Sequence, residues 1–285
     1  MLGIPLLQFF LFRYLPLWNA QIAFKDFNPV EGVFRSAWAG FIHFKTFFQS
    51  FYFAELIRNT LFYSFAKLLV GVPAAITLAV ALAESHSKLL RKTVQTISYI
   101  PHFLSWVIML GVLMMLLSPG NGLVNEAIKA AGGKPVAFLT TPSAFPLVVI
   151  FSDLWKELGW SAIIFMAALL GIDPVLYEAA AVEGANRLQR TRHITLPGIA
   201  PVVMVVVLLR LGTILDAGFH QIFVLYSTPV LGVADIIDTW VYRQGILDFQ
   251  FSLATAVGLF KGVIGMILLI LSSRLIRRLN GSALY

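Results

Sequence analysis

Six long runs of apolar residues, separated by shorter polar segments, dominate the hydropathy pattern of the chain. At about 1.5 Å of rise per residue, a helix of about 20 apolar residues crosses the roughly 30 Å hydrocarbon layer of a bilayer. An open strand would leave backbone groups unpaired in lipid, so each run is predicted to be helical. The predicted spans cover residues 2–23, 60–83, 94–117, 145–170, 199–219 and 253–276.

Composition supports a membrane protein. Hydrophobic residues make up 59% of the chain, charged residues 12%, and the mean hydropathy is +0.84, far from the averages of soluble domains. We therefore expect an all-α integral membrane protein with six transmembrane helices, organised as one domain over residues 1–285. The first run meets no charge before Arg13, so we interpret it as a span and not as a cleaved signal peptide. Pro73, Pro101 and Gly111 are expected to bend their helices.

Lysine and arginine are concentrated in the segments that follow the second, fourth and sixth spans. These segments lie on the same side of a membrane crossed an even number of times, and positive residues mark the cytoplasmic side. We expect both termini on that side. We attribute the net charge of +7 to basic residues retained on the cytoplasmic side, and we expect no nucleic-acid partner. The residues concerned are Lys88, Arg91, Lys92, Arg187, Arg190, Arg192, Arg274, Arg277 and Arg278.

Motifs for chemistry within this chain are absent. Without cysteine there are no disulfides and no thiol catalysis. The stretch "GGKP" at residues 132–135 lacks the spacing and the hydroxyl residue of a phosphate-binding loop, and neither HExxH nor GxSxG occurs. We expect no enzymatic activity, metal or cofactor in this chain, and an energy source in another polypeptide.

A polar insert, containing "YEAAAVEGANRLQRTRHITLPGIAP", separates the fourth and fifth spans. Asp173 is a suitable N-cap with Pro174 at the first helical position. Gly184 is suited to a turn, and Asn186 is suited to cap a second short helix. Pro197 is expected to end helical structure before the fifth span. The prediction is a helix, a glycine turn and a second helix at the cytoplasmic surface.

The alanines of this insert indicate how its surface is used. Ala179, Ala180 and Ala181 would let another surface approach the backbone closely. A helix lying on lipid would instead carry Trp, Phe and Leu on its buried face. Docking to a cytoplasmic partner is favoured over a solvated loop, and both interpretations remain open on the residues alone.

The spacing of residues in the insert resembles a known signature. The pattern is similar to the EAA motif of permease subunits in binding-protein-dependent ABC importers. Similarity extends over nearly the whole chain, where "YIPHFLSWV", "SDLWKELGW" and "DTWVYRQG" resemble the oligosaccharide and polysaccharide branch, near alginate-type permeases. The residues that carry the signature are Glu178, Ala179, Ala180, Gly184, Ile194, Leu196 and Pro197.

The resemblance implies a fold, partners and a mechanism. It implies the type I ABC importer permease fold in a bacterial inner membrane, with residues 173–197 as a coupling segment seated in a groove of an ATPase subunit. Glu178 would orient the segment by hydrogen bonding or ion pairing. The implied partners are a second homologous permease, two ATP-binding-cassette ATPase subunits that hold ATP and Mg, an extracytoplasmic solute-binding protein and membrane lipid. The implied substrate is an oligosaccharide or polysaccharide, with an acidic one such as alginate as one candidate.

Ionisable residues at membrane depth are costly unless they are paired or face water, so they are candidates for the substrate path. Cations facing one cavity would suit an anionic sugar, although such cations also occur in ion pairs. Aromatic rings would stack on sugar faces, although Trp and Tyr also anchor helices at membrane interfaces. Asp153, Lys156 and Glu157 are spaced to pair along one helix face. The path candidates are Lys67, Arg210, Asp216, His220, Lys261 and Trp160.

A rival hypothesis is an ion-gradient-driven secondary transporter in which these charges form a relay. It predicts uptake into vesicles containing this chain alone. The permease hypothesis predicts no uptake without partner subunits and ATP.

Overall fold

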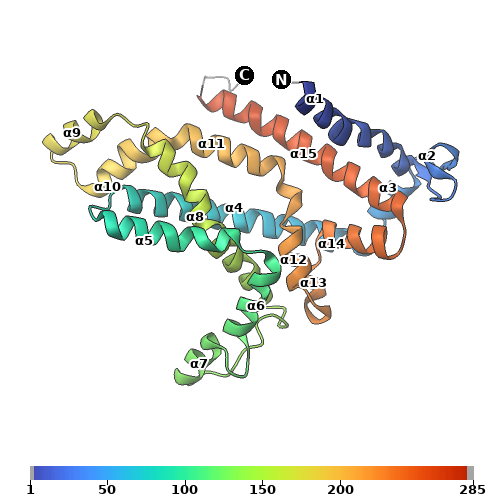
Figure 1. Cartoon of the computed structure of the whole chain (residues 1–285), viewed down its shortest axis with the longest axis horizontal. Coiled ribbons are helices and arrows are strands. Elements are labelled where there is room, and N and C mark those ends of the chain that lie inside the picture. Colours follow the sequence, from blue (N-terminus) through green and yellow to red (C-terminus); the bar gives the residue numbers. More distant parts are fainter. Residues whose placement is uncertain (1–2, 281–285) are drawn as a thin grey trace.

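Long helices lying side by side form most of the molecule (Figure 1). The structure, a computed structural model, describes residues 3–280, with the backbone only in residues 275–280. The all-α prediction is confirmed, with one two-stranded hairpin as the exception among the described residues. The longest helices are α4 (Phe53–Ala83), α8 (Phe145–Leu169), α11 (Leu196–Gly212) and α15 (Phe251–Asn280).

The pairing of α4 with α8 is the most extensive helix contact in the described part of the chain. Ala75 and Ala79 of α4 pack against Ala162 and Phe165 of α8, and all four are buried. Small side chains allow helix backbones to approach closely, which is the usual basis of association between apolar helices in lipid. This pair forms the frame against which the other helices are placed.

The first predicted span is one helical segment of changing type. It consists of α1 (Gly3–Phe9), a π segment (Phe10–Tyr14) and a 3₁₀ segment (Leu15–Phe24), and the last of these packs on α15. Leu2, where the prediction begins, lies outside the described residues. The side chains of α1 are all exposed, as expected of a surface that faces lipid.

Three helices of the described residues are long and apolar enough to cross a membrane, namely 53–83, 187–212 and 251–274. Two further spans result if each of two bent helix pairs is counted as one crossing. The count of six crossings therefore remains a prediction, although each of the six predicted runs contains helical structure.

The predicted span 94–117 is not one straight helix. It comprises α5 (Lys88–Tyr99), a 3₁₀ turn (Ile100–Phe103) and α6 (Trp106–Leu117), and the two arms meet at 112°. The break follows Pro101, one of the residues expected to bend a helix, whereas Pro73 lies inside α4 without ending it.

The predicted span 199–219 ends early. Helix α11 stops at Gly212, and a 3₁₀ turn (Ile214–Asp216) leads to α12 (Phe219–Leu225). Ala217 and Gly218 have φ values of 42° and 88°, a left-handed conformation that cannot continue a helix. The chain therefore changes direction within the predicted span.

The connections after the first, third and fifth predicted spans hold short elements. Strands β1 (Lys25–Asp26) and β2 (Ala37–Trp38) pair antiparallel, with Lys25 opposite Trp38, and flank α2 (Gly32–Arg35). Helices α3 (Ile42–Phe48) and α7 (Leu123–Ala130) lie in the first and second connections. The connection after the fifth predicted span holds a broken helix, α13 (Leu231–Ala234) followed by α14 (Ile237–Tyr242). It breaks because Asp235 and Ile236 are extended, and Asn59 Nδ2 donates to the Asp235 carbonyl at 3.0 Å.

Pro197 does not separate the insert from the fifth span, so that prediction is wrong. Helix α10 (Arg187–Arg190) continues through a π segment (Thr191–Thr195) into α11, giving one helix over 187–212. The Leu196 amide donates to the Thr191 carbonyl, five residues back. This wider turn directly before the proline helps the helix to accommodate a residue without an N–H.

Candidate coupling surface and membrane cavity

The insert folds as a helical hairpin at one end of the bundle. Helix α9 (Pro174–Val182) begins where the Asp173 carboxylate accepts a hydrogen bond from the Val175 amide at 2.9 Å. Gly184 turns the chain with φ = 78°, and Asn186 and Gln189 form a reciprocal capping box at the start of α10. These local predictions agree with the structure because each depends on neighbouring residues only.

An open pocket of about 590 Å³ lies between α9 and α10. Ala179, Ala180, Gly184 and Ile194 of the signature line it, together with Glu183 and Arg190 among others. Leu196 and Pro197 lie farther along the continuous helix and are exposed. No side chain of α9 is buried, so the whole helix is accessible to a partner.

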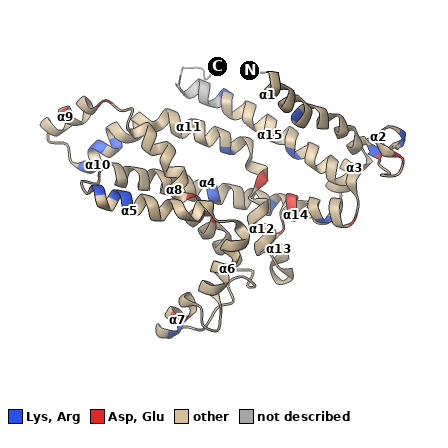
Figure 2. Ribbon diagram, in the orientation of Figure 1, with Lys and Arg blue, Asp and Glu red and all other residues tan. Residues whose placement is uncertain are grey.

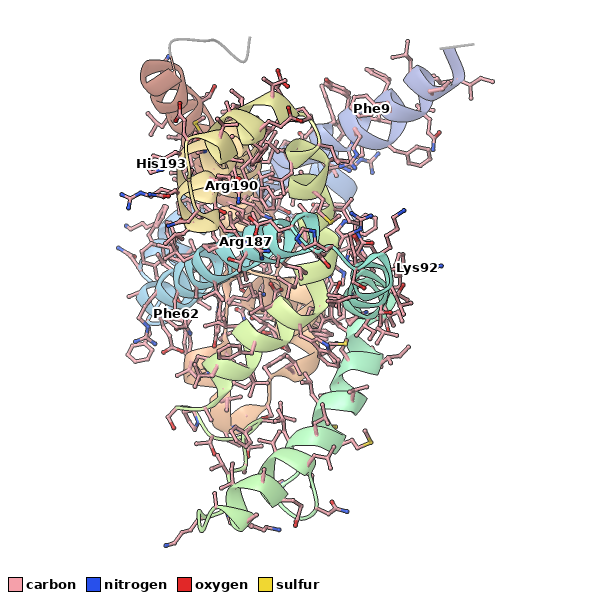
Figure 3. All side chains as sticks on the ribbon, turned by 90° about the vertical axis from the view of Figure 1, so that its left-hand side faces the viewer. Phe9, Phe62, Lys92, Arg187, Arg190 and His193 are labelled. Atoms are coloured by element: carbon pink, nitrogen blue, oxygen red, sulfur yellow. The ribbon has the colours of Figure 1, made fainter. Side chains whose placement is uncertain are left out.

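Basic residues surround this surface. Figure 2 shows Lys and Arg gathered where α5 begins and where α10 lies. Seen from that end, Arg187 and Arg190 of α10 lie near His193, and Lys92 of α5 lies to one side (Figure 3). The first two of the three predicted basic segments therefore share one end of the bundle, as the sequence indicated.

The orienting role expected of Glu178 stays a prediction. Among the described residues its carboxylate makes no hydrogen bond and no ion pair, and it is exposed. The two arms of the hairpin are joined by the Tyr177 hydroxyl, which lies 3.0 Å from the Thr195 hydroxyl, and the Thr191 hydroxyl donates to Glu84, directly after α4, at 3.1 Å. Tyr177 was missed because a tyrosine beside an alanine run carries no distinctive pattern.

A second site is a cavity of about 530 Å³ between α4, α8, α11 and the turn before α12. Three of the six path candidates line it, namely Lys67, Arg210 and Asp216. Asp153 and Glu157 of α8 complete its charged lining. The cavity thus carries two cationic and three acidic side chains, so it is not a cluster of cations.

Lys67 is fully engaged in this cavity. Its ammonium lies 3.2 Å from Asp153 Oδ1, donates to the Ala217 carbonyl at 3.0 Å and also donates to Gln221 Oε1. Gln221 in turn donates to the carbonyl of Val149 at 2.7 Å. Lys67 therefore joins α4 and α8 to the turn where α11 gives way to α12.

Arg210 differs from Lys67. It lies in the last turn of α11, is exposed toward the cavity, and has no carboxylate within 4.0 Å among the described residues. Asp216 is 69% exposed and lies 3.9 Å from the Lys261 ammonium. Arg210 is thus the cavity-lining cation that is available to a ligand.

The other three candidates lie outside this cavity. Lys261 forms an ion pair with Asp238 of α14. His220 is exposed at the start of α12, with its ring 5.5 Å from that of Phe219. Trp160 is 44% exposed and stacks on His102, with ring centroids 4.4 Å apart.

The expected pairing of Asp153 with Lys156 along one face of α8 is wrong. Asp153 pairs with Lys67 of α4, and Glu157 lies 2.9 Å from His102 Nδ1 in the turn after α5. Lys156 donates to backbone carbonyls of that same turn and lies 3.9 Å from Glu157. Asp153 and Glu157 therefore have closer partners outside α8 than in the next turn of α8 itself.

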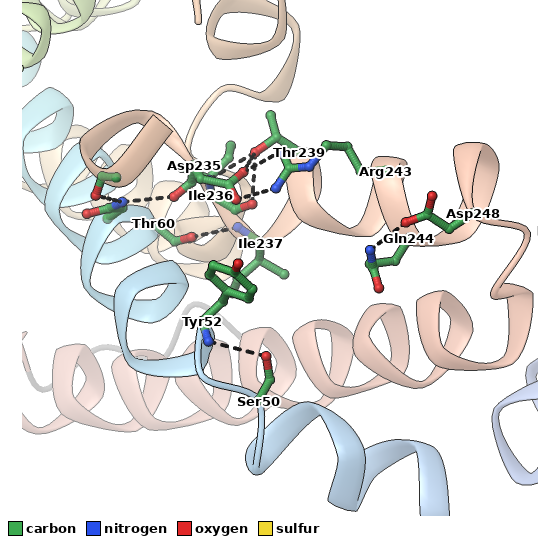
Figure 4. A network of polar contacts seen from close by, with 12 residues as sticks. Ser50, Tyr52, Thr60, Asp235, Ile236, Ile237, Thr239, Arg243, Gln244 and Asp248 are labelled. Atoms are coloured by element: carbon green, nitrogen blue, oxygen red, sulfur yellow. Dashed lines mark hydrogen bonds and ion pairs between the residues drawn. The ribbon is translucent and has the colours of Figure 1, made fainter. Parts of the chain in front are cut away.

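A polar network near the N-terminal end of α4 was not expected from the sequence (Figure 4). Arg243 pairs with Asp235, which also accepts from the Thr239 hydroxyl at 2.6 Å. Thr60 of α4 accepts from the Ile237 amide at 3.0 Å. In the sequence, the network is visible only as an acidic residue, Asp235, eight positions before a basic one, Arg243. That spacing does not indicate that the pair is buried.

Comparison with known proteins identifies the family. The profile of the binding-protein-dependent transport system inner membrane component matches residues 71–283. A polygalacturonan/rhamnogalacturonan transport system permease protein of Bacillus subtilis, YteP, is 41% identical, covering 98% of this chain and 87% of the relative. The protein LplB of the same organism is 39% identical, covering 98% and 88%.

Solved structures agree with this result. A chain of a bacterial ABC transporter involved in the import of the acidic polysaccharide alginate superposes with a TM-score of 0.91 at 41% identity, covering 98% of this chain and 94% of that one. A second structure, of the alginate transporter in complex with an alginate pentasaccharide-bound periplasmic protein, gives 0.90 at 40% identity, covering 99% and 94%. The fold is therefore that of a type I ABC importer permease, and this chain belongs to the family of binding-protein-dependent transport system inner membrane components.

Proposed function

We propose that this chain is a permease subunit of an ABC importer for an acidic oligosaccharide or polysaccharide. The observation that carries the proposal is the accessible α9–Gly184–α10 hairpin, with its open, alanine-lined pocket at the basic end of the bundle. A partner that moves this hairpin would move α8 and α11, because both are continuous with it in the chain. The substrate class is supported by relatives named for polygalacturonan/rhamnogalacturonan and alginate transport.

The proposed assembly contains a second homologous permease, two ATPase subunits and an extracytoplasmic solute-binding protein. ATP and Mg would be held by the ATPase subunits, since this sequence has no phosphate-binding loop. We place the complex in a bacterial inner membrane, with both termini and the hairpin on the cytoplasmic side. The shared location of two basic segments supports this orientation.

A secondary transporter is not favoured as the alternative. The family is defined by dependence on a binding protein. In addition, the lysines expected to form a relay are held in ion pairs, Lys67 with Asp153 and Lys261 with Asp238.

Cross-linking tests the proposed coupling role. The chain has no cysteine, so Ala180→Cys would introduce a unique thiol in the pocket of the hairpin. In membranes containing the whole transporter, we expect a thiol-specific cross-linker to join this position to an ATPase subunit. Met115→Cys on α6, exposed but distant from the hairpin, should give no such product. Absence of an ATPase adduct from Ala180→Cys in an actively transporting complex would contradict the proposal.

Arg210 provides a test of the substrate class. Hydrogen bonds to charged groups are worth about 1.5–3 kcal/mol, so Arg210→Gln should lower uptake of an acidic oligosaccharide by about tenfold or more. Uptake of the same oligosaccharide with its carboxyl groups reduced to alcohols should change little. Uptake of both compounds in proteoliposomes is the measurement, with Lys129→Gln on exposed α7 as the control variant. Equal losses for both compounds would remove charge matching as the role of Arg210.

A further inference from the structure

At the elbow between α5 and α6, the carbonyls of His102 and Leu104 accept no backbone amide among the described residues, whereas the Pro101 carbonyl accepts from the Leu104 amide at 3.2 Å. After the 3₁₀ turn Ile100–Phe103, Leu104 and Ser105 are extended, and α6 leaves at 112°. The last carbonyls of a helix have no amide to accept from within it. In a membrane, water is not available to satisfy such groups, so another part of the protein must do so.

Lys156 of α8 supplies the donors. Its ammonium donates to the carbonyls of Pro101 at 3.3 Å, of Leu104 at 2.8 Å, and of His102. An ammonium has three donors, and each has an acceptor here. The residue is 6% exposed, and its ammonium lies 5.8 Å from the centroid of the Trp106 ring at the start of α6.

The counterion of this lysine is attached to the same elbow. Glu157 lies 3.9 Å from the Lys156 ammonium and 2.9 Å from His102 Nδ1. A positive charge at the end of a helix is also favoured by the partial negative charge of its last carbonyls. Two consecutive residues of α8 therefore hold the elbow, one through the backbone and one through a side chain.

Helix α8 also leads directly to the coupling surface. It ends at Leu169, and α9 begins at Pro174 with a bend of 76° between them. A displacement of α9 can thus be passed to α8 through residues 170–173. The contacts of Lys156 are then the polar connection through which α8 acts on the elbow.

We infer that Lys156 is a positioning residue that fastens the α5–α6 elbow to α8, so that both move as one body when the coupling surface is displaced. The inference rests on the proposed function and adds a residue far from the coupling segment to its mechanism. Lys156→Met keeps the length and the apolar stem of the side chain but removes all three donors.

Uptake and ATP hydrolysis in the reconstituted whole transporter test this inference. For Lys156→Met we expect ATP hydrolysis within about twofold of wild type and uptake lowered about tenfold, a loss in the range typical of coupling between sites. Lys129→Met, which removes an exposed lysine of α7, should leave both rates unchanged. Equal uptake per ATP in wild type and Lys156→Met would overturn the inference.

A distance measurement keeps the test valid if Lys156→Met does not assemble. Spin labels at Met115→Cys on α6 and Phe151→Cys on α8, both exposed, report the distance between the elbow and α8 in a chain that still contains Lys156. We expect the same distance distribution with and without trapped ATP. A shift on trapping ATP would show that the elbow moves independently of α8 and would overturn the inference. Failure of the proposed function would appear differently, as a wild-type complex without ATP-dependent uptake.

Discussion

Alanine in place of Gly159 should lower the free energy of unfolding by about 3 kcal/mol, the upper end of the usual cost of overpacking. A Cβ atom at this position would lie 2.3 Å from the Ser98 carbonyl oxygen and 2.5 Å from its carbonyl carbon. Both are backbone atoms of α5, so no side-chain rotation can relieve the contact. The helices would have to separate at the point where α5 packs on α8, next to the elbow held by Lys156.

The measurement is thermal unfolding of the purified transporter in detergent. The quantity compared is the temperature at which this subunit unfolds. Gly262→Ala on α15 is the matched control, because nothing lies within 4 Å of the Cβ that it adds. That change should be neutral or stabilising by about 0.5–1 kcal/mol, since alanine favours a helix over glycine. Similar melting temperatures for the two variants would show that α5 and α8 do not meet as closely as described.

The apolar runs in the sequence predicted the ends of a helix accurately where that helix is straight. The run predicted over 145–170 is α8, Phe145–Leu169, within one residue at each end. The run over 94–117 is as apolar in the sequence but is broken at Leu104. The sequence could suggest a bend at Pro101, but it could not show a full elbow. The elbow depends on Lys156, which lies 52 residues from Leu104.

The coupling segment was predictable to the extent that its structure is local. Asp173 and Asn186 act as caps through bonds to residues two and three positions away. Pro197 was misinterpreted because the π segment before it, Thr191–Thr195, has no recognised sequence signal. Because this π segment keeps the helix continuous, the hairpin is joined to α11 without a flexible connection.

The charged residues in the membrane were recognised as costly, but their partners were not. Spacing along α8 suggested that Asp153 would pair with Lys156, whereas Lys67 is its partner. Pairing across helices depends on how α4, α8 and α5 are packed, and that arrangement is not encoded in the spacing of any one helix. As a result, the cations expected along the substrate path do not gather in one cavity; the cavity holds mostly paired charges, with Arg210 as the exception.

Replacing Lys67 with methionine should destabilise the subunit by about 3–5 kcal/mol, the cost of removing one partner from a buried ion pair. Asp153, the Ala217 carbonyl and Gln221 would all lose the group that they share. Because Ala217 lies in the left-handed turn between α11 and α12, the loss should be largest in that turn.

A double-mutant cycle separates the ion pair from the backbone contact. If the unpaired carboxylate causes most of the loss, then Lys67→Met combined with Asp153→Asn should be more stable than Lys67→Met alone, because no buried charge remains. Lys129→Met removes an exposed pair with Glu126 and should cost less than about 1 kcal/mol. Unfolding in detergent measures wild type, the single variants Lys67→Met and Asp153→Asn, their combination, and Lys129→Met as the control. If Asp153→Asn restores nothing, the carbonyl of Ala217 and the side chain of Gln221 are the main partners of Lys67, and its role is to hold the turn below the cavity and not to neutralise α8.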